Sequence, residues 1–353
     1  MAVTVAAATA YRGNVPVYFD GLGSVVAYYT VTVRTRVDGQ LMSVHFREGE
    51  DVREGDLLAE IDPRPFQVQL EQAEGQLARD QASLANARVD LERYRTLLAE
   101  DAVPKQQLDT QGALVEQLQG ALKSDQAAID NAKLQLVYCR VTAPISGRIG
   151  LRLVDPGNIV HAGDANGLLV ITELQPITVV FTLPEDSLQP VLGKLRMGVS
   201  LPVEAYNRDK TLKLASGRLL TVDNQIDQNT GTTRLKAVFE NLQGTLFPNQ
   251  FVNVRLLVDT LRGQVIVPSV AIQRGSQGTY VYVIKPDNTV EFRLVEAGVS
   301  EGNFTAVTQG LKAGERVVTD GAEKLQPGST VTVRPETAVP PGAGIVPTRR
   351  GGG

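Results

Sequence analysis

The sequence predicts a mixed β plus α fold in which a long helical hairpin interrupts a series of β domains. Three observations support this prediction. Residues 65–139 carry a heptad pattern, glycines repeat at matched positions on both sides of that segment, and short runs rich in Val and Thr fill most of the remaining chain. These patterns divide the 353 residues into four modules, and we expect them to form an elongated protein.

The composition excludes several classes of function. The chain has 35 basic and 39 acidic side chains, one Cys, two His and no Trp. A single Cys cannot form an internal disulfide, and one Cys with two His makes a poor zinc site. A slightly acidic chain with few aromatic residues does not resemble a nucleic-acid-binding protein. We also expect no transmembrane helix, because no apolar run reaches about 18 residues.

The N-terminal part, up to residue 61, has the character of β structure. Runs rich in Val, Tyr and Thr at 15–19 and 31–37 are broken by Gly and Asp-Gly. Strand-like sequence begins within a few residues of Met1, so we expect an export signal or membrane anchor to lie upstream. We assign residues 1–24 to the same β domain as residues 261–335, because a nested insertion brings the two chain ends together.

Residues 65–139 predict two antiparallel α-helices. Apolar residues recur every seven positions in both halves of this segment: Leu70, Leu77, Leu84, Leu91 and Leu98, then Leu108, Val115, Leu122, Ile129 and Leu136. This period is typical of a coiled coil, and the turn-length break at 99–104 contains the helix-breaking Pro104. The seam is narrow, which leaves the outer faces free for lateral packing against other copies or partners.

Two aspartates interrupt this seam. Asp80 and Asp125 lie at similar distances from the break, so we expect them to face each other across the hairpin. We interpret them as solvated edges of a thin seam, with a role in register or partner packing as the alternative.

The segments on either side of the helices repeat each other. Glycines 10 and 6 residues apart occur in both of them: Gly39, Gly49 and Gly55, then Gly147, Gly157 and Gly163. Repeated glycines indicate repeated backbone turns, because Gly adopts positive φ without strain. Two halves of this kind resemble the quasi-symmetric biotinyl/lipoyl fold. We therefore predict a split lipoyl-like domain at 34–64 and 140–174, with the hairpin at 65–139 inserted between its halves.

This fold raises the hypothesis of a biotinyl or lipoyl carrier. Such a carrier needs a Lys on the turn that joins the two halves. No Lys precedes Lys105, none lies between Lys133 and Lys194, and the helical hairpin occupies the junction. We therefore predict no attached cofactor and keep the carrier as a less favoured alternative.

The remaining sequence predicts two further β domains. Residues 175–260 contain about five strand-like runs and a short helical stretch at 188–195, which favour a small antiparallel β-barrel. Residues 25–33 could add a strand to this barrel. Residues 261–335 complete the last β domain, with a hairpin signal at Asp287-Asn288. The Pro- and Gly-rich residues 336–353 predict a disordered tail.

A lipoyl-like domain split by an α-hairpin and followed by β domains resembles the periplasmic adaptors, or membrane fusion proteins, of tripartite efflux pumps (the HlyD/RND adaptor family). The similarity extends over residues 3–333, and its most specific stretches are 36–41, 60–66, 142–144, 180–185, 223–227, 230–232 and 246–252. In this family the last β domain is membrane-proximal and docks on the inner-membrane transporter.

The resemblance also implies a function. It implies a non-enzymatic adaptor in the periplasm, anchored to the inner membrane, that serves multidrug efflux and antibiotic resistance. Its partners would be an inner-membrane resistance-nodulation-division (RND) transporter, an outer-membrane TolC-like channel, and further copies of itself in a hexameric ring or trimer of dimers. No cofactor and no nucleic acid are implied.

The family has a motif at the hairpin tip that contacts the outer-membrane channel: Arg, then Leu four residues on, then Ser seven further. Arg93 and Leu97 match it, but Pro104 stands at the third position. The resemblance therefore implies a channel contact at Arg93, Leu97, Val103, Pro104 and Lys105, with altered hydrogen bonding where the Ser hydroxyl is lost. Pro104 suits the first turn of a second helix.

We find no pattern that predicts catalysis. His45 and His161 have no partners at metal-ligand spacing, and Cys139 has no evident base beside it, so we interpret all three as surface or packing residues. Three alternatives stay open: an adaptor for an ABC-type or MFS-type exporter, a free-standing carrier or enzyme, and a plain coiled-coil scaffold.

Overall fold

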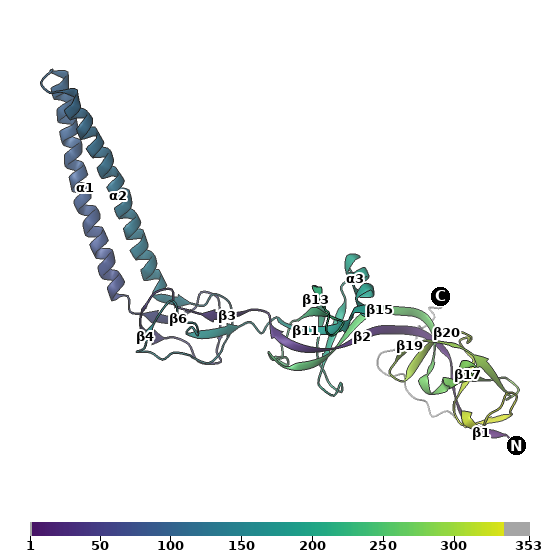
Figure 1. The fold of residues 1–353 in the computed structure, drawn as a ribbon. Helices are drawn as coiled ribbons and strands as arrows, with labels where there is room; N and C mark the ends of the chain where they lie inside the picture. Colours follow the sequence, from purple (N-terminus) through teal and green to yellow (C-terminus); the bar gives the residue numbers. More distant parts are fainter. Residues whose placement is uncertain (1, 335–353) are drawn as a thin grey trace, which may run out of the picture. The chain divides into compact units, whose positions relative to one another are not determined.

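The computed structural model describes residues 2–334, and these form two compact units. Residues 27–176 make up one, here called the hairpin unit; residues 2–26 and 177–334 make up the other, here called the β unit. Together they confirm the predicted mixed β plus α fold, because a helical hairpin in the first unit is followed by two β domains in the second (Figure 1). The predicted tail at 336–353 lies outside the described residues.

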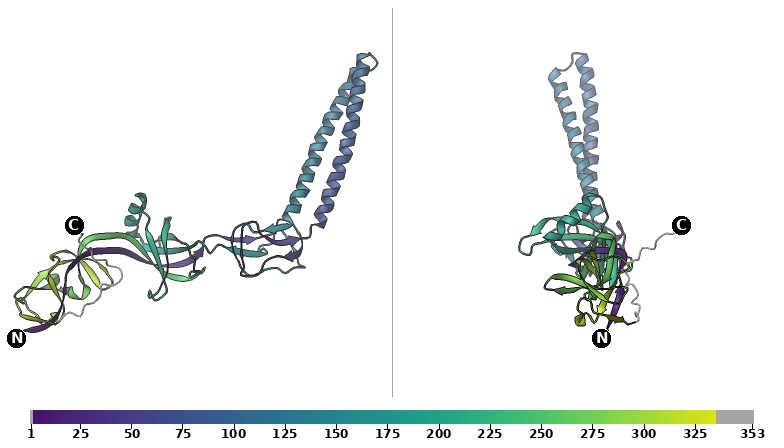
Figure 2. Two further views of the ribbon diagram at one scale, coloured as in Figure 1. Left: turned by 180° about the vertical axis from the view of Figure 1, so that it is seen from behind. Right: turned by 90° about the vertical axis from the view of Figure 1, so that its right-hand side faces the viewer.

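The helical hairpin consists of α1 (Arg64–Ala99) and α2 (Lys105–Tyr138), which lie side by side in both views of the chain (Figures 1 and 2). The heptad positions form its seam, where Leu84, Ala87 and Val115 make one buried cluster and Ile129 and Ala132 are buried nearer the lipoyl-like domain. Asp80 and Asp125 interact across the seam, which confirms that they face each other. Few side chains of the seam are buried, and they combine alanines with larger aliphatic residues such as Leu84 and Ile129.

The lipoyl-like domain consists of two four-stranded sheets, and each sheet takes strands from both halves of the repeat. One sheet has the order β7 (Arg140–Thr142), β6 (Leu57–Ile61), β4 (Gly39–Val44), β9 (Ile159–Val160). The other has the order β3 (Thr30–Val33), β10 (Leu169–Thr172), β8 (Gly147–Ile149), β5 (Asp51–Val52). The core between them is formed by residues such as Leu41, Leu58 and Ile171. The insertion of the helices therefore leaves the two halves interleaved.

The β unit contains an antiparallel barrel. Its sheet has the order β12 (Pro202–Tyr206), β13 (Lys213–Asp227), β14 (Thr232–Phe239), β11 (Ile177–Pro184), β2 (Tyr11–Ala27), β15 (Phe251–Pro268), β20 (Phe304–Gln309), β19 (Glu296–Glu301). The first six strands close on themselves because β12 also pairs with β15. Helix α3 (Leu188–Arg196) packs on the barrel through Val191, which is fully buried.

Strand β2 passes through both β domains. Its residues 11–13 pair with 264–266 of β15, beside β20, and its residues 15–24 pair with 251–261 in the barrel (Figure 2). Close packing against β11 explains Gly21 and Gly23 of β2. A Cβ on Gly21, for example, would lie 2.5 Å from the Thr182 carbonyl oxygen. The segment 25–33 is divided, because β2 ends at Ala27 while β3 pairs with β10 of the lipoyl-like domain. The sequence-based domain boundaries stay predictions.

The last β domain joins both ends of the described chain. Its sheet has the order β16 (Gln273–Gly275), β17 (Gly278–Ile284), β21 (Arg316–Asp320), β1 (Val3–Thr9), β22 (Val331–Val333), and β18 (Val290–Leu294) pairs with β17. Strand β1 runs parallel to β22, with Val3 opposite Val331. Val5, Val318 and Val331 pack in one buried cluster behind this sheet.

Candidate functional site

The hairpin tip is a tight reversal of the chain between α1 and α2. After Ala99 the helical pattern ends, and Asp101 adopts a left-handed φ of 54°. The amide of Ala102 donates to the Leu97 carbonyl oxygen at 2.9 Å, which turns the chain back on the last turn of α1. The side chain of Leu97 is partly buried. Backbone hydrogen bonds from Ala102 and Asp101 to the last turn of α1 fix the backbone of the tip.

The five residues predicted to contact the channel gather around this reversal. Arg93 is exposed and forms an ion pair with Asp90 at 2.9 Å, while Val103 is partly buried and Pro104 and Lys105 are exposed. Pro104 is the N-cap of α2, with φ −70° and ψ 144°, and no side chain caps this helix start. The tip therefore presents two cationic side chains and uncapped amides of α2 to solvent.

The six glycines of the lipoyl-like repeat do not share one role. Gly49, Gly55 and Gly157 have positive φ values of 77°, 91° and 96°, as the repeated turns predict. Gly147 instead sits in strand β8, where a Cβ would lie 2.7 Å from the Thr172 carbonyl oxygen. For Gly39 the close neighbour is Ile61, whereas Gly163 has an ordinary φ and open space around its Cα. Close approach of neighbouring atoms explains Gly39 and Gly147. Neither positive φ nor close approach explains Gly163.

The turn that follows the middle glycine is built alike in both halves of the repeat. The Arg53 amide donates to Asp56 Oδ2 at 2.8 Å, and the His161 amide donates to Asp164 Oδ2 at 2.9 Å. Each aspartate thus satisfies a backbone donor of its own turn. His161 occupies the position in the second half of the repeat that Arg53 occupies in the first. Its backbone amide therefore has a structural role in the turn.

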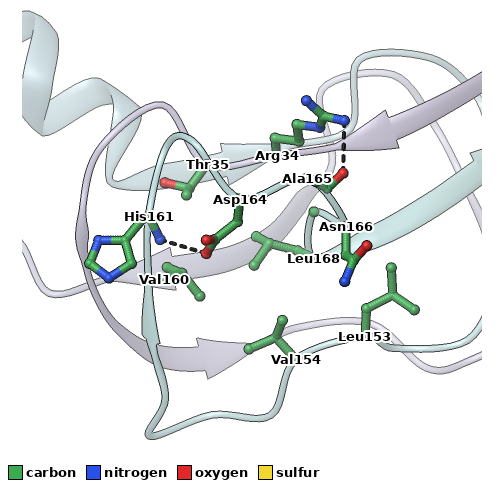
Figure 3. Close-up of a pocket in the computed structure, with 11 residues that line it drawn as sticks. Arg34, Thr35, Leu153, Val154, Val160, His161, Asp164, Ala165, Asn166 and Leu168 are labelled. Carbon is green, nitrogen blue, oxygen red and sulfur yellow. Dashed lines mark hydrogen bonds between the residues drawn. The ribbon is translucent and has the colours of Figure 1, made fainter.

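A cavity of about 380 Å³ lies where the repeat loses its symmetry (Figure 3). The second half has three extra residues, Ala165 to Gly167, between Asp164 and Leu168. Arg34 donates to the Ala165 carbonyl oxygen at 2.8 Å and so holds this loop over an apolar floor that includes Leu153 and Leu168. Arg34 and Asp164 are thus engaged in holding this loop and its turn.

The residues weighed for catalysis occupy structural positions. His45 Nε2 lies 3.0 Å from Ser43 Oγ, and both histidines are well exposed. Cys139 is buried and donates to the Gln135 carbonyl oxygen at 3.3 Å, and burial together with the nearby Asp62 charge raises the pKa of its thiol. Within residues 2–334 no group of three His, Cys, Asp or Glu side chains could hold a metal ion. No helix in this range is long and apolar enough to cross a membrane.

Arg255 was not identified from the sequence, and it connects the barrel to Glu301 at the end of β19. Its Nε donates to Asp20 Oδ1 of β2 at 3.2 Å, and its guanidinium lies 4.0 Å from the centre of the Tyr18 ring. Asp20 precedes it by 235 residues, so no local spacing pattern could have revealed the pair. The alternation of valines with Asn253 and Arg255 was the available sequence signal, since it places Arg255 on the face opposite to Val252 and Val254.

Comparison with known proteins assigns the modules to one family. Residues 29–172 match the model described as "RND MFP, barrel-sandwich hybrid domain", and residues 176–260 match "RND MFPs, beta-barrel domain". Residues 264–324 match "RND MFPs, C-terminal permuted SH3 domain". These matches run in the order of the modules of the fold.

Curated relatives and solved structures agree with this assignment. Multidrug resistance protein MdtA of Klebsiella pneumoniae is 52% identical over 329 residues, which cover 93% of this chain and 80% of that protein. MdtA of Salmonella typhimurium is 50% identical over 336 residues, covering 95% and 81% of the two chains. A MacA-MexA chimeric protein with the Pseudomonas aeruginosa MexA α-hairpin domain shares the fold at 24% identity and a TM-score of 0.55, covering 87% of this chain and 98% of the chimera.

MacA of Actinobacillus actinomycetemcomitans also shares the fold, at 21% identity and a TM-score of 0.54, covering 89% of this chain and 99% of that one. The sequence matches extend through the hairpin, the lipoyl-like domain and both β domains. The chain therefore belongs to the family of RND membrane fusion proteins and is an adaptor subunit of that family.

Proposed function

We propose that this chain is the periplasmic adaptor of a tripartite RND-type multidrug efflux pump, where it bridges an inner-membrane transporter and an outer-membrane channel. Identity of 52% to a multidrug resistance protein, over 93% of the chain, is the observation that carries the proposal. Membership of the RND membrane fusion family implies both kinds of partner. The role is mechanical rather than enzymatic, and the chain is anchored to the inner membrane.

We place the channel contact at the hairpin tip, on Arg93, Leu97, Val103, Pro104 and Lys105. The reversal fixed by the Ala102 to Leu97 hydrogen bond supports this placement, because a rigid tip loses little entropy on binding. The exposed Arg93 and Lys105 and the uncapped start of α2 favour carboxylate or carbonyl groups on the channel surface.

Crosslinking in cells tests this contact. A photoreactive residue at 93 or 97 is expected to capture the outer-membrane channel. The same residue at 79, an exposed position in the middle of α1, is the control and should not capture it. Absence of any channel adduct from both tip positions, with the chain present at normal levels, would contradict the bridging role.

We propose further that the chain forms a hexameric ring or a trimer of dimers, in which neighbouring hairpins lie side by side. The faces opposite the seam support this proposal, because they carry small or apolar residues every seven positions. On α1 these are Val68, Gly75, Ala82 and Val89, and on α2 they are Ala113, Gly120, Ala127 and Leu134; all are exposed. Such faces allow close helix packing and are unusual for a solvated helix surface.

A pair of lysine substitutions tests the side-by-side packing. Ala82→Lys introduces a charge into the small-residue face, and Gln81→Lys introduces the same charge at the neighbouring exposed position. We expect only Ala82→Lys to weaken self-association in analytical ultracentrifugation and to restore drug susceptibility in cells. Equal behaviour of the two variants would exclude this face as the interface.

A further inference from the structure

The two aspartates of the seam interrupt its apolar pattern midway along the hairpin. Asp80 on α1 and Asp125 on α2 both occupy heptad positions that point to the partner helix, three residues after Leu77 and Leu122 respectively. On the side of the tip they are followed by the buried cluster of Leu84, Ala87 and Val115. On the side of the lipoyl-like domain Ile129 and Ala132 are buried. The carboxyl pair thus lies between two apolar contacts.

The two carboxyl groups have different surroundings. Asp80 is 20% exposed, accepts a hydrogen bond from Gln76 Nε2 at 2.9 Å, and lies 3.8 Å from Arg79 Nε. Oδ2 of Asp125 is buried and has no hydrogen-bond partner among the described residues. Asp80 therefore has polar partners on its own helix, whereas Oδ2 of Asp125 has no hydrogen-bond donor beside it within residues 2–334.

The protonation state of Asp80 and Asp125 decides whether their carboxyl groups can form a hydrogen bond with each other. An ionised carboxylate only accepts hydrogen bonds, so two carboxylates in contact bond only when one of them carries a proton. Burial, and then the charge and hydrogen bond of Asp80, raise the pKa of Asp125, while Arg79 opposes this shift. The nearest charged residues along α2, Lys123 and Asp130, are exposed and do not compensate the pair. Among the described residues, Arg79 is thus the cation that opposes the rise in the pKa of Asp125.

We propose that Asp80 and Asp125 form a proton-dependent clasp between the two helices. When the pair shares one proton, a hydrogen bond between the carboxyl groups joins α1 to α2. When both groups are ionised, like charges in the seam push the helices apart at this level, while the apolar contacts on both sides hold. The clasp makes the rigidity of the hairpin depend on the pH of the surrounding compartment.

The sign of the effect follows from the direction of the shift. A carboxyl group whose pKa is higher in the folded than in the unfolded chain contributes full stability below its unfolded pKa. That contribution is lost as the pH rises through the folded pKa. The hairpin should therefore be firmest in mild acid and should loosen locally toward neutral and alkaline pH.

Amide hydrogen exchange of the full chain tests the clasp. After correction for intrinsic exchange rates, we expect exchange near residues 80 and 125 to rise at least about threefold from about pH 4 to about pH 8. In Asp125→Asn the amide donates to Asp80 without a proton from solvent, so this rise should disappear. Asp130→Asn, an exposed change on the same helix, should keep it.

A second readout does not depend on any variant. The carboxyl carbon of Asp125, followed by NMR, should titrate above the ordinary range for Asp. Titration of Asp125 within the ordinary range, or an equal pH response in the native chain and in Asp125→Asn, would overturn the proposal. Should Asp125→Asn fail to fold, Asp80→Asn takes its place, with the same loss of pH response expected.

Discussion

One terminal nitrogen of Arg255 donates to both carboxylate oxygens of Glu301, at 2.9 and 2.8 Å. Arg255 lies in the barrel part of β15 and Glu301 ends β19 beside the last β domain, so this contact crosses the junction between two modules. Both side chains are less than 25% exposed, at 24% and 22%. Partial burial weakens competition from water, so the contact fixes the junction more firmly than a surface ion pair would.

Removal of the guanidinium should therefore destabilise the β unit. We expect Arg255→Gln to lower its free energy of unfolding by about 1–3 kcal/mol, because Glu301 loses charged hydrogen bonds in a partly buried place. Lys210→Gln, which removes an exposed ion pair to Asp20 of 3.1 Å, should have an effect below about 1 kcal/mol. Urea unfolding measures both variants, and equal effects would show that the contact does not stabilise the junction.

The repeat glycines should respond to alanine in three different ways. Gly147→Ala places a methyl group against the Thr172 carbonyl oxygen and should destabilise the lipoyl-like domain by about 1–3 kcal/mol. Gly157→Ala has room but keeps a φ of 96°, which should cost about 1 kcal/mol. Gly163→Ala should lie within about 0.5 kcal/mol of the native chain. Thermal unfolding gives this order, and a large loss for Gly163→Ala would contradict it.

Two substitutions of Pro104 at the tip should change the stability of the first turn of α2 in opposite directions. Pro104→Ser creates a capping box with Gln107, three residues on, and supplies the side-chain cap that α2 lacks. Its gain of about 1 kcal/mol exceeds the loss of about 0.5 kcal/mol from the missing proline ring. Pro104→Ala loses the proline ring without gaining a side-chain cap, so it should only destabilise the start of α2. Amide exchange at residues 105–107 should slow in the first variant and quicken in the second, and the same direction in both would contradict the capping argument.

The stability of the last β domain should depend on pH, because Arg293 pairs with the carboxyl groups of Glu291 and Glu315. Hydrogen bonds from Arg293 lower the pKa of Glu291; burial alone would raise the pKa of Glu315, but hydrogen bonding to Arg293, at 2.7 Å, makes the net change a decrease. Carboxyl groups with lowered pKa contribute stability at neutral pH that is lost as the pH falls through their folded pKa values.

We therefore expect Arg293→Gln to melt roughly 2–4 °C below the native chain at neutral pH. The difference should shrink as the pH falls below the ordinary Glu range and through the lowered pKa values of the native chain, because both carboxyls then become protonated in either chain. Lys324→Gln, which removes an exposed pair of 3.9 Å, serves as the control with no such pH-dependent difference. A difference that stays constant with pH would contradict the assigned ion pairs.

The helical hairpin and the split repeat could be predicted from the sequence because their signals are local. The seven-residue period follows from contacts within two helices, and the turns at Gly49 and Gly157 require positive φ wherever they occur. Membership of the adaptor family was recognised for the same reason, since its motifs are short and contiguous. The proposed contact residues of the tip came from that resemblance, and their role stays a prediction.

Features that depend on distant strands could not be predicted in this way. The length of β2 is set by its distant neighbours, β15, which pairs with residues 11–24, and β11 on the other edge. The sequence near residue 24 therefore carries no sign that the strand continues to Ala27. Gly147 is required by the approach of Thr172 rather than by its own backbone angles. Arg255 becomes informative only once Asp20 and Glu301 are placed beside it.

The nesting of the two units sets an order for assembly during synthesis of the chain. Residues 27–176 contain all the strand and helix partners of the hairpin unit, so this unit can fold as soon as its own last strand has emerged. Strand β1 is made first, yet its partners β21 and β22 are made last. Strand β2 can pair with β11 once residues 177–184 have emerged, but its other edge waits for β15. Strand β1 thus spends most of synthesis unpaired, and an early stop before residue 251 leaves a folded hairpin unit attached to an open edge of β2 that is prone to aggregation.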